Sequence, residues 1–151
     1  MTNQKNASKL LDSPPIPVQV KLAAAWTSFM FLYVYVDIYG FYKPGVIDDI
    51  LIGRVFEFDV SATLLTAFIA MLAVPALMVA LSAMLAPTVN RFTNLVVASL
   101  YIPFTVFNAA GETWEWAAFY AIAIGLELLL LALILRAAWT WPRVPAVPAG
   151  A

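Results

Sequence analysis

Long apolar runs, separated by a small number of charged residues, dominate this chain. Each run is close to the 20 residues that an α-helix needs to cross a bilayer. None of the runs alternates apolar and polar positions, as the strands of a membrane β-barrel would. The pattern predicts an all-α fold, a bundle of four transmembrane helices with spans at about residues 18–41, 61–86, 92–110 and 115–141.

The two ends of the chain differ from its middle. Residues 1–16 are polar and run into PPIP at 14–17, and residues 143–151 are rich in proline, which cannot continue a helix. We expect a flexible tail at each end. The membrane domain is then expected to cover residues 17–142.

Lysine and arginine fall mostly on one side of the predicted spans. Cytoplasmic loops carry the excess of these residues in membrane proteins, so the bias predicts that both termini are cytoplasmic. The other side is acidic and carries only Lys43 and Arg54 of the eight basic residues. The six on the first side are Lys5, Lys9, Lys21, Arg91, Arg136 and Arg143.

The first outer loop, residues 42–61, is too apolar for a plain connection. Pro44 can open a short helix in VIDDILI and Gly53 can close it. Such an interfacial helix is expected to lie on the membrane surface with its isoleucine and leucine side toward lipid. A lid over an outer cavity is the alternative interpretation.

The amino-acid composition limits the ligands and reactions that can be expected of this chain. Hydrophobic residues make up 64% of the chain and charged residues 11%, which is typical of a membrane protein in contact with a lipid bilayer. The net charge of −1 gives no basic surface for nucleic acid. The chain has neither cysteine nor histidine, so we assign no catalytic residue, no metal site and no cofactor.

The third predicted span carries polar residues along one face. Asn94, Tyr101, Thr105, Asn108 and Glu112 fall within a narrow arc of a helix with 3.6 residues per turn. Polar groups within a span normally face protein or water, so this face should point inward. It can serve hydrogen bonding between helices or line a cavity.

Glu127 is the only charged residue inside the fourth apolar run. It lies about 18 Å below Glu115 along a helix, a level that suggests Tyr101 and Ser99 as its hydrogen-bond partners. A carboxylate without a cation in such surroundings is expected to be protonated. It is either a proton or cation site, or a neutral hydrogen-bonding group that joins two helices.

Further polar residues of the first and fourth spans lie in the same outer half of the membrane. They suggest an outward-facing pocket with Glu127 near its floor. The candidate pocket residues are Glu127, Asp37, Tyr33, Tyr101, Thr105, Asn108, Glu112 and Tyr120.

A second pattern on the fourth span consists of small residues. Ala117, Ala121 and Gly125 recur every four residues, on a face well away from Glu127. Small residues at this spacing allow helices to approach closely. This small-residue seam predicts a contact with another helix, within the bundle or in a second protomer.

Several short motifs resemble a family of small bacterial four-span membrane proteins that is known as a domain of unknown function. They are YVYVDIYGFYKPG at 33–45, PTVNRFTN at 87–94, GETWEW at 111–116, and Glu127 followed by AWTWP at 138–142. The resemblance covers about residues 18–142 and implies a bacterial inner-membrane protein without an established activity. In hydropathy and length the chain also resembles DoxX-like proteins, although without cysteine no thiol role carries over.

Within PTVNR, we expect Pro87 to end the second span and Asn90 or Thr88 to cap the third. Both motifs that form hairpins, this one and GETWEW, can be explained by topology alone.

Three functions remain open from the sequence. The first is a small transporter or channel-like protein in which Glu127 and Asp37 handle protons or a small cationic or polar solute. The second is an accessory or structural subunit, supported by the small-residue seam, that binds another membrane protein. The third is an enzyme acting on a lipid or quinone, for which no nucleophile is arranged.

Overall fold

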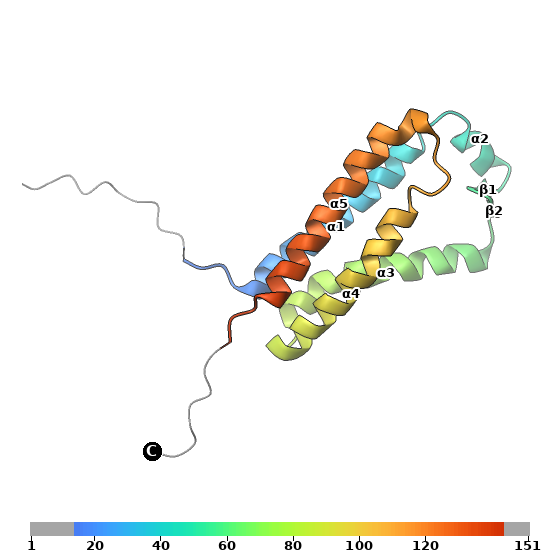
Figure 1. The fold of residues 1–151 in the computed structure, drawn as a ribbon. Helices are drawn as coiled ribbons and strands as arrows, with labels where there is room; N and C mark the ends of the chain where they lie inside the picture. The colour runs from blue at the N-terminus through green and yellow to red at the C-terminus, as the bar shows by residue number, and fades with distance from the viewer. Residues whose placement is uncertain (1–13, 144–151) are drawn as a thin grey trace, which may run out of the picture.

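The computed structural model describes residues 14–143, so the tails predicted at 1–16 and 143–151 lie almost wholly outside the described residues. The described part is mostly helical, as predicted (Figure 1). Its four long helices are α1 (Val18–Gly40), α3 (Ala62–Met84), α4 (Pro87–Phe107) and α5 (Ala117–Trp139). The short elements are α2 (Val46–Leu51), β1 (Arg54–Val55), β2 (Phe58–Asp59) and the 3-10 turn η1 (Trp114–Trp116).

Three of the long helical segments can cross a membrane by length and apolar composition. They are α1, α3 and the segment Trp114–Trp139 that contains α5. A chain with three such helices is a multi-pass membrane protein in contact with lipid. Helix α4 has 21 residues but is less apolar, since Asn90, Arg91 and Asn94 lie in its first two turns.

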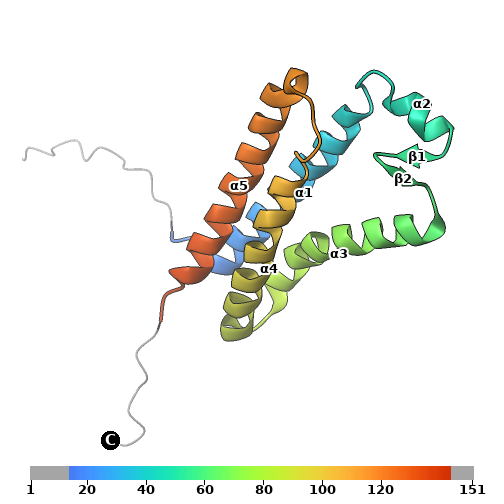
Figure 2. The same cartoon turned by 45° about the vertical axis from the view of Figure 1, so that its right-hand side comes forward.

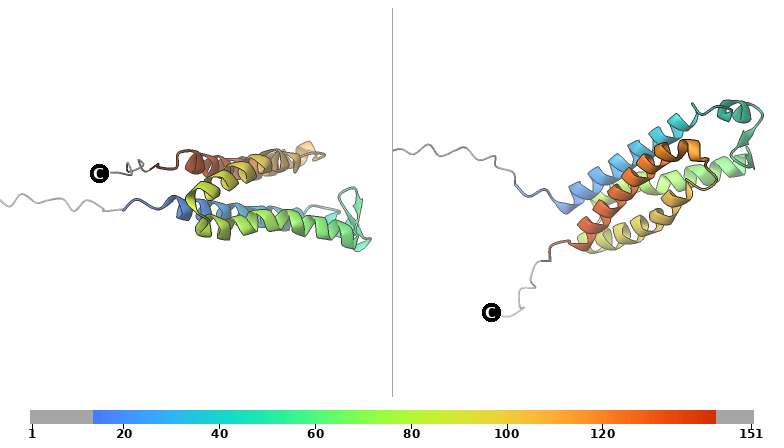
Figure 3. Two further views of the ribbon diagram at one scale, coloured as in Figure 1. Left: turned by 90° about the horizontal axis from the view of Figure 1, so that it is seen from below. Right: turned by 45° about the horizontal axis from the view of Figure 1, so that its top comes forward.

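The long helices form two layers. Figure 3 shows α1 and α3 in one layer and α4 and α5 in the other. Helix α5 contacts both α1 and α4, and α1 contacts α3. Helices α3 and α4 meet at their hairpin and then diverge toward their other ends (Figure 2). The apolar core lies between the layers, and its largest members are Trp26, Phe29, Leu22, Met78, Leu131 and Ile134.

The hairpin between α3 and α4 is shorter than the sequence predicted. Pro87 begins α4 instead of ending the preceding span, and Ala86 is the N-cap residue. Proline suits the first turn of a helix because its fixed φ is helical and its missing N–H needs no partner there. The predicted capping by Asn90 or Thr88 is therefore wrong, and Asn90 lies inside the helix.

Four buried polar side chains join α1, α3 and α4 close to this hairpin. The Trp26 indole N–H donates to Asn94 Oδ1 at 2.7 Å, and the Ser82 hydroxyl donates to the same oxygen at 3.3 Å. Asn94 Nδ2 donates to Asn90 Oδ1 at 2.7 Å, and Asn90 Nδ2 donates to the Ser82 carbonyl at 2.6 Å. All four residues are fully buried, so these bonds fix how three helices meet.

A proline explains a second link between α3 and α4. Pro75 lies inside α3 and has no N–H, so the carbonyl of Met71 four residues earlier loses its helical donor. The Tyr101 hydroxyl donates to that carbonyl at 2.5 Å. The hydrogen bond restores a partner to Met71 and ties the middle of α4 to α3.

The first outer loop contains the predicted short helix. Helix α2 covers Val46–Leu51, with Gly45 at its N-cap in the left-handed region at φ 87°. Gly53 follows it at φ 81°. The loop then forms a two-stranded antiparallel hairpin in which Arg54 pairs with Asp59. The sequence analysis did not predict this hairpin, because strands of two residues are too short to show a periodic pattern.

Candidate functional site

Glu127 and Thr105 face each other between α5 and α4. Glu127 is 2% exposed and Thr105 is fully buried. The two side chains are close enough to interact, yet Glu127 Oε2 and Thr105 Oγ1 have no hydrogen-bond partner by distance and angle. Buried polar atoms in native proteins are nearly always paired. Two unpaired buried oxygens at one place therefore mark this point of the bundle as unusual.

Side chains of α1 lie next to this pair. Asn108 Nδ2 donates to the Tyr33 hydroxyl at 3.4 Å, which joins α4 to α1. Asp37, one turn farther along α1, lies close enough to Tyr33, Tyr120 and Glu127 for its charge to act on all three. Three helices thus contribute oxygen-bearing side chains to one region.

Lys43 closes the end of this region that lies near η1. Its ammonium group forms a salt bridge with Glu112, and both side chains are largely buried. It also donates to the Tyr120 hydroxyl at 3.3 Å and lies 5.5 Å from the centre of the Trp116 ring. This role of Lys43 was not evident from the sequence, in which the residue served only to predict the orientation of the chain. The available signal was its rarity, since only two cations lie on the acidic side.

The predicted partners of Glu127 are wrong. Tyr101 donates its hydroxyl to Met71 on α3, and Ser99 is exposed. Glu127 instead lies level with Thr105, one turn beyond Tyr101 on α4. The predicted partners came from comparing depths along two helices taken as straight. Pro103 lies inside α4 between Tyr101 and Thr105, and a proline can kink a helix, which that comparison leaves out.

Seven of the eight candidate pocket residues, together with Lys43, thus lie at three levels, whereas Tyr101 bonds to Met71 of α3. Lys43, Glu112 and Tyr120 lie at the end near η1, Tyr33, Asn108 and Asp37 come next, and Thr105 and Glu127 lie farthest from that end. Carboxylates and hydroxyls can bind a proton or a hard cation. In residues 14–143, no three side chains of histidine, cysteine, aspartate or glutamate are grouped so as to hold a metal ion.

The small-residue seam does not pack inside the chain at its inner end. Ala121 and Gly125 are exposed, and a Cβ placed on Gly125 would meet no atom within 4 Å. Ala117 is half-buried. The prediction of a contact within the bundle is therefore not met at Gly125, and a contact with a second chain stays a prediction.

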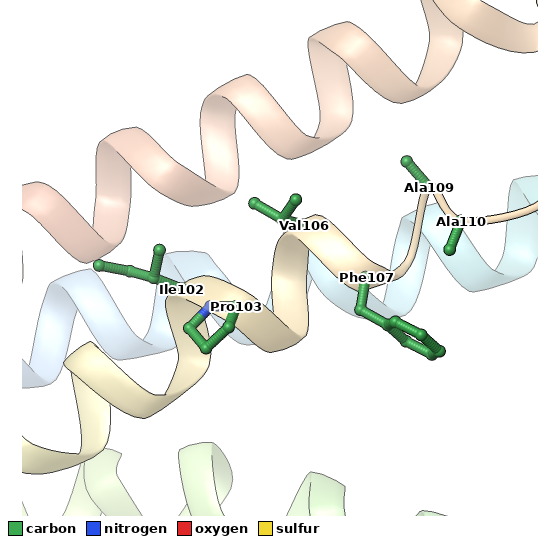
Figure 4. A pocket seen from close by; sticks show the side chains of 6 residues that line it. All are labelled: Ile102, Pro103, Val106, Phe107, Ala109 and Ala110. Carbon is green, nitrogen blue, oxygen red and sulfur yellow. The ribbon is translucent and has the colours of Figure 1, made fainter.

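A surface hollow of about 600 Å³ lies at the C-terminal end of α4 (Figure 4). Its side chains are apolar, and none of them belongs to the candidate pocket. The lining residues are Ile102, Pro103, Val106, Phe107, Ala109 and Ala110. A hollow of this composition suits lipid chains and does not extend the polar region.

Comparison with known proteins identifies a family for this chain but no activity. The model of a family of unknown function, DUF6326, matches residues 18–143. No curated protein and no solved structure matches the chain.

Proposed function

We propose that this chain, which belongs to the family of unknown function DUF6326, is a small transporter or channel-like protein. Its polar pocket faces outward, and Glu127 at the floor takes up a proton or a small cationic or polar solute. The supporting observation is the buried pair of Thr105 Oγ1 and Glu127 Oε2, neither of which has a partner. An unpaired buried polar group costs about 1–3 kcal/mol, and a bound proton, water or cation would remove that cost.

The proposal includes four spans, with both termini in the cytoplasm of a bacterium. Helix α4 is about 31 Å long at helical rise, which is enough to cross a bilayer. Its polar residues Asn90, Asn94 and Thr105 are buried, whereas its exposed side chains include Phe92, Leu100 and other apolar residues. This division supports a helix with lipid on one side and protein on the other.

Helix α2 fits the same arrangement. Ile47, Ile50 and Leu51 are exposed on it, and Ile52 follows it with an exposed side chain. An exposed apolar side on a short helix next to the end of a span supports a position on the membrane surface.

The salt bridge between Lys43 and Glu112 would form the entrance of the path that a cation takes toward Glu127. Lys43 neutralises Glu112, so the charge of the entrance depends on whether this pair is closed. An incoming cation competes with the Lys43 ammonium group for Glu112, then meets Asp37, Tyr33 and finally Glu127. A proton moving the same way would be held on a carboxyl oxygen of Glu127.

The test is flux in proteoliposomes that contain the purified full chain. Proton entry is followed with a trapped pH dye, and uptake of sodium, potassium and tetramethylammonium is measured beside it. Glu127→Gln keeps the shape of the side chain but cannot ionise, so flux should fall at least tenfold. Glu115→Gln removes an exposed carboxylate near the outer end of α5 and should leave flux unchanged. Equal flux in wild type and Glu127→Gln would refute the proposal.

A second candidate function is an accessory subunit. The observation that favours it is the exposed part of the small-residue seam, where Gly125 has no neighbour to pack against. Another helix could approach closely there. The measurement is a pull-down of the tagged full chain from its own membranes in mild detergent, for wild type and for Gly125→Leu. Wild type that retains no other membrane protein, or the same retained protein in both variants, would count against this function.

A further inference from the structure

A groove runs between α4 and α5 at the end where the chain enters α4 and leaves α5. Its volume is about 460 Å³, within the range of small-molecule sites. Leu95 and Ser99 of α4 line one side, and Leu135 of α5 lines the other. Arg136, Trp139 and Thr140 complete the lining at the end of α5. The groove is thus apolar along its length and carries a cation and an aromatic ring near the membrane boundary.

A second arginine lies beside the same end. Arg91 is one helical turn before Leu95, and its Nε donates to the carbonyl of Ala138 at 3.1 Å. Its guanidinium carbon lies 5.8 Å from the centre of the Trp139 ring. These two contacts hold Arg91 at the groove and leave its terminal N–H groups for another acceptor.

Neither arginine is neutralised by a carboxylate in the part of the chain that the structure describes. The ion pairs of residues 14–143 are Lys43 with Glu112 and Arg54 with Glu57, both at the opposite end of the bundle. One arginine that lines the groove and a second that contacts its Trp139 therefore lie at this end of the bundle without a counter-charge.

We propose that this groove binds one anionic phospholipid. Its phosphate accepts hydrogen bonds from Arg136 and Arg91, since a guanidinium presents paired donors that match phosphate oxygens. One acyl chain lies along Leu95, Ser99 and Leu135. Trp139, which is 70% exposed in the isolated chain, covers the glycerol region, where amphipathic rings are favoured.

Charge and shape together select this ligand. Basic pockets between membrane helices are suited to anionic headgroups, and the bilayer supplies an acyl chain to any apolar groove that faces it. A free phosphate ion would use the arginines but gain nothing from Leu95 and Leu135. The inference is independent of the proposed transport function, because none of the groove residues belongs to the candidate pocket.

The test is native mass spectrometry of the full chain, released from nanodiscs with equal amounts of phosphatidylglycerol and phosphatidylcholine of the same acyl chains. One phosphatidylglycerol per chain should be retained in preference to phosphatidylcholine. Arg136→Gln should lower that preference about fivefold, the effect of about one surface cation. Arg136 is exposed, so this variant is expected to fold.

Two further variants distinguish binding of the lipid in the groove from general electrostatic attraction between anionic lipid and arginine. Ser99→Trp fills the groove but keeps both arginines, and it should abolish retention of the lipid. Arg54→Gln removes an exposed arginine at the far end of the bundle and should change nothing. Equal retention of both lipids by wild type, or full preference in Arg136→Gln, would overturn the proposal. Preference that survives in Ser99→Trp would show that the arginines bind phosphate without the groove, and would also overturn it.

Discussion

Replacing Asn94 with leucine tests whether the buried polar network near the α3–α4 hairpin holds the helices together. Asn94 Oδ1 accepts from Trp26 at 2.7 Å and from Ser82 at 3.3 Å, so two of its hydrogen bonds cross between helices. Leucine has the same branched shape but accepts no hydrogen bond and carries bulkier methyl groups. The substitution therefore removes the bonds, and any cost of the larger side chain is common to the two backgrounds compared below.

The expected loss follows from the contacts. Hydrogen bonds between membrane helices contribute about 0.6 kcal/mol each, so the two bonds account for about 1.2 kcal/mol. The Trp26 N–H is then buried without an acceptor, which costs a further 1–3 kcal/mol or so. We expect Asn94→Leu to lower the free energy of unfolding by about 2–4 kcal/mol. In a Trp26→Phe background the indole donor is absent, so the cost of Asn94→Leu should fall by about 1 kcal/mol or more.

Reversible unfolding in mixed micelles, followed by far-UV circular dichroism, measures these free energies. Leu100→Ala is the control on the same helix, since Leu100 is 66% exposed and should change stability little. An Asn94→Leu variant as stable as the wild type would refute the assignment. Equal costs of Asn94→Leu in both backgrounds would show that Trp26 and Asn94 do not depend on each other.

Three further predictions concern the outer half of the bundle. Tyr101→Phe leaves the carbonyl of Met71 without a partner and should lower the free energy of unfolding by about 1–2 kcal/mol, measured in the same micelles; a neutral effect would mean that water replaces the hydroxyl. Lys43→Gln removes the cation that pairs with Glu112, so cation uptake in proteoliposomes should change severalfold, and identical uptake would show that the salt bridge does not control the entrance. Thr105→Val removes a buried hydroxyl that has no partner, so stability should stay equal or rise slightly while flux falls; a clear loss of stability would mean that the hydroxyl is satisfied in the folded protein.

The sequence allowed the helices to be predicted because charged residues separate the apolar runs. The long helices lie close to the predicted spans, and helix α2 lies where Pro44 and Gly53 suggested. Asn94 and Thr105, which the helical period placed on one face, are both buried. These features depend on the order of apolar, polar and turn-forming residues within short segments, which can be read directly from the sequence.

The contacts of the candidate site depend on geometry that the pattern does not contain. Proline can end one helix or begin the next, and Pro87 begins α4, so the expected hairpin was wrong. Tyr101 finds the carbonyl that Pro75 leaves open on α3, and that pairing requires both helices to be placed first. Lys43 and Glu112 are far apart in the chain, and only the packed bundle brings them together.

The central claim is that the polar region opens to water from the outer side as far as Glu127, which is buried in this structure together with Thr105. The chain has no cysteine, so a single Thr105→Cys substitution supplies its only thiol, next to Glu127. Glu115→Cys is the exposed control, and Ala98→Cys, fully buried two turns deeper on α4, is the inaccessible control. A small charged thiosulfonate added from the outer side should label Thr105→Cys at a rate nearer that of Glu115→Cys. Labelling as slow as that of Ala98→Cys would contradict the account and show that Glu127 joins helices in a dry interior.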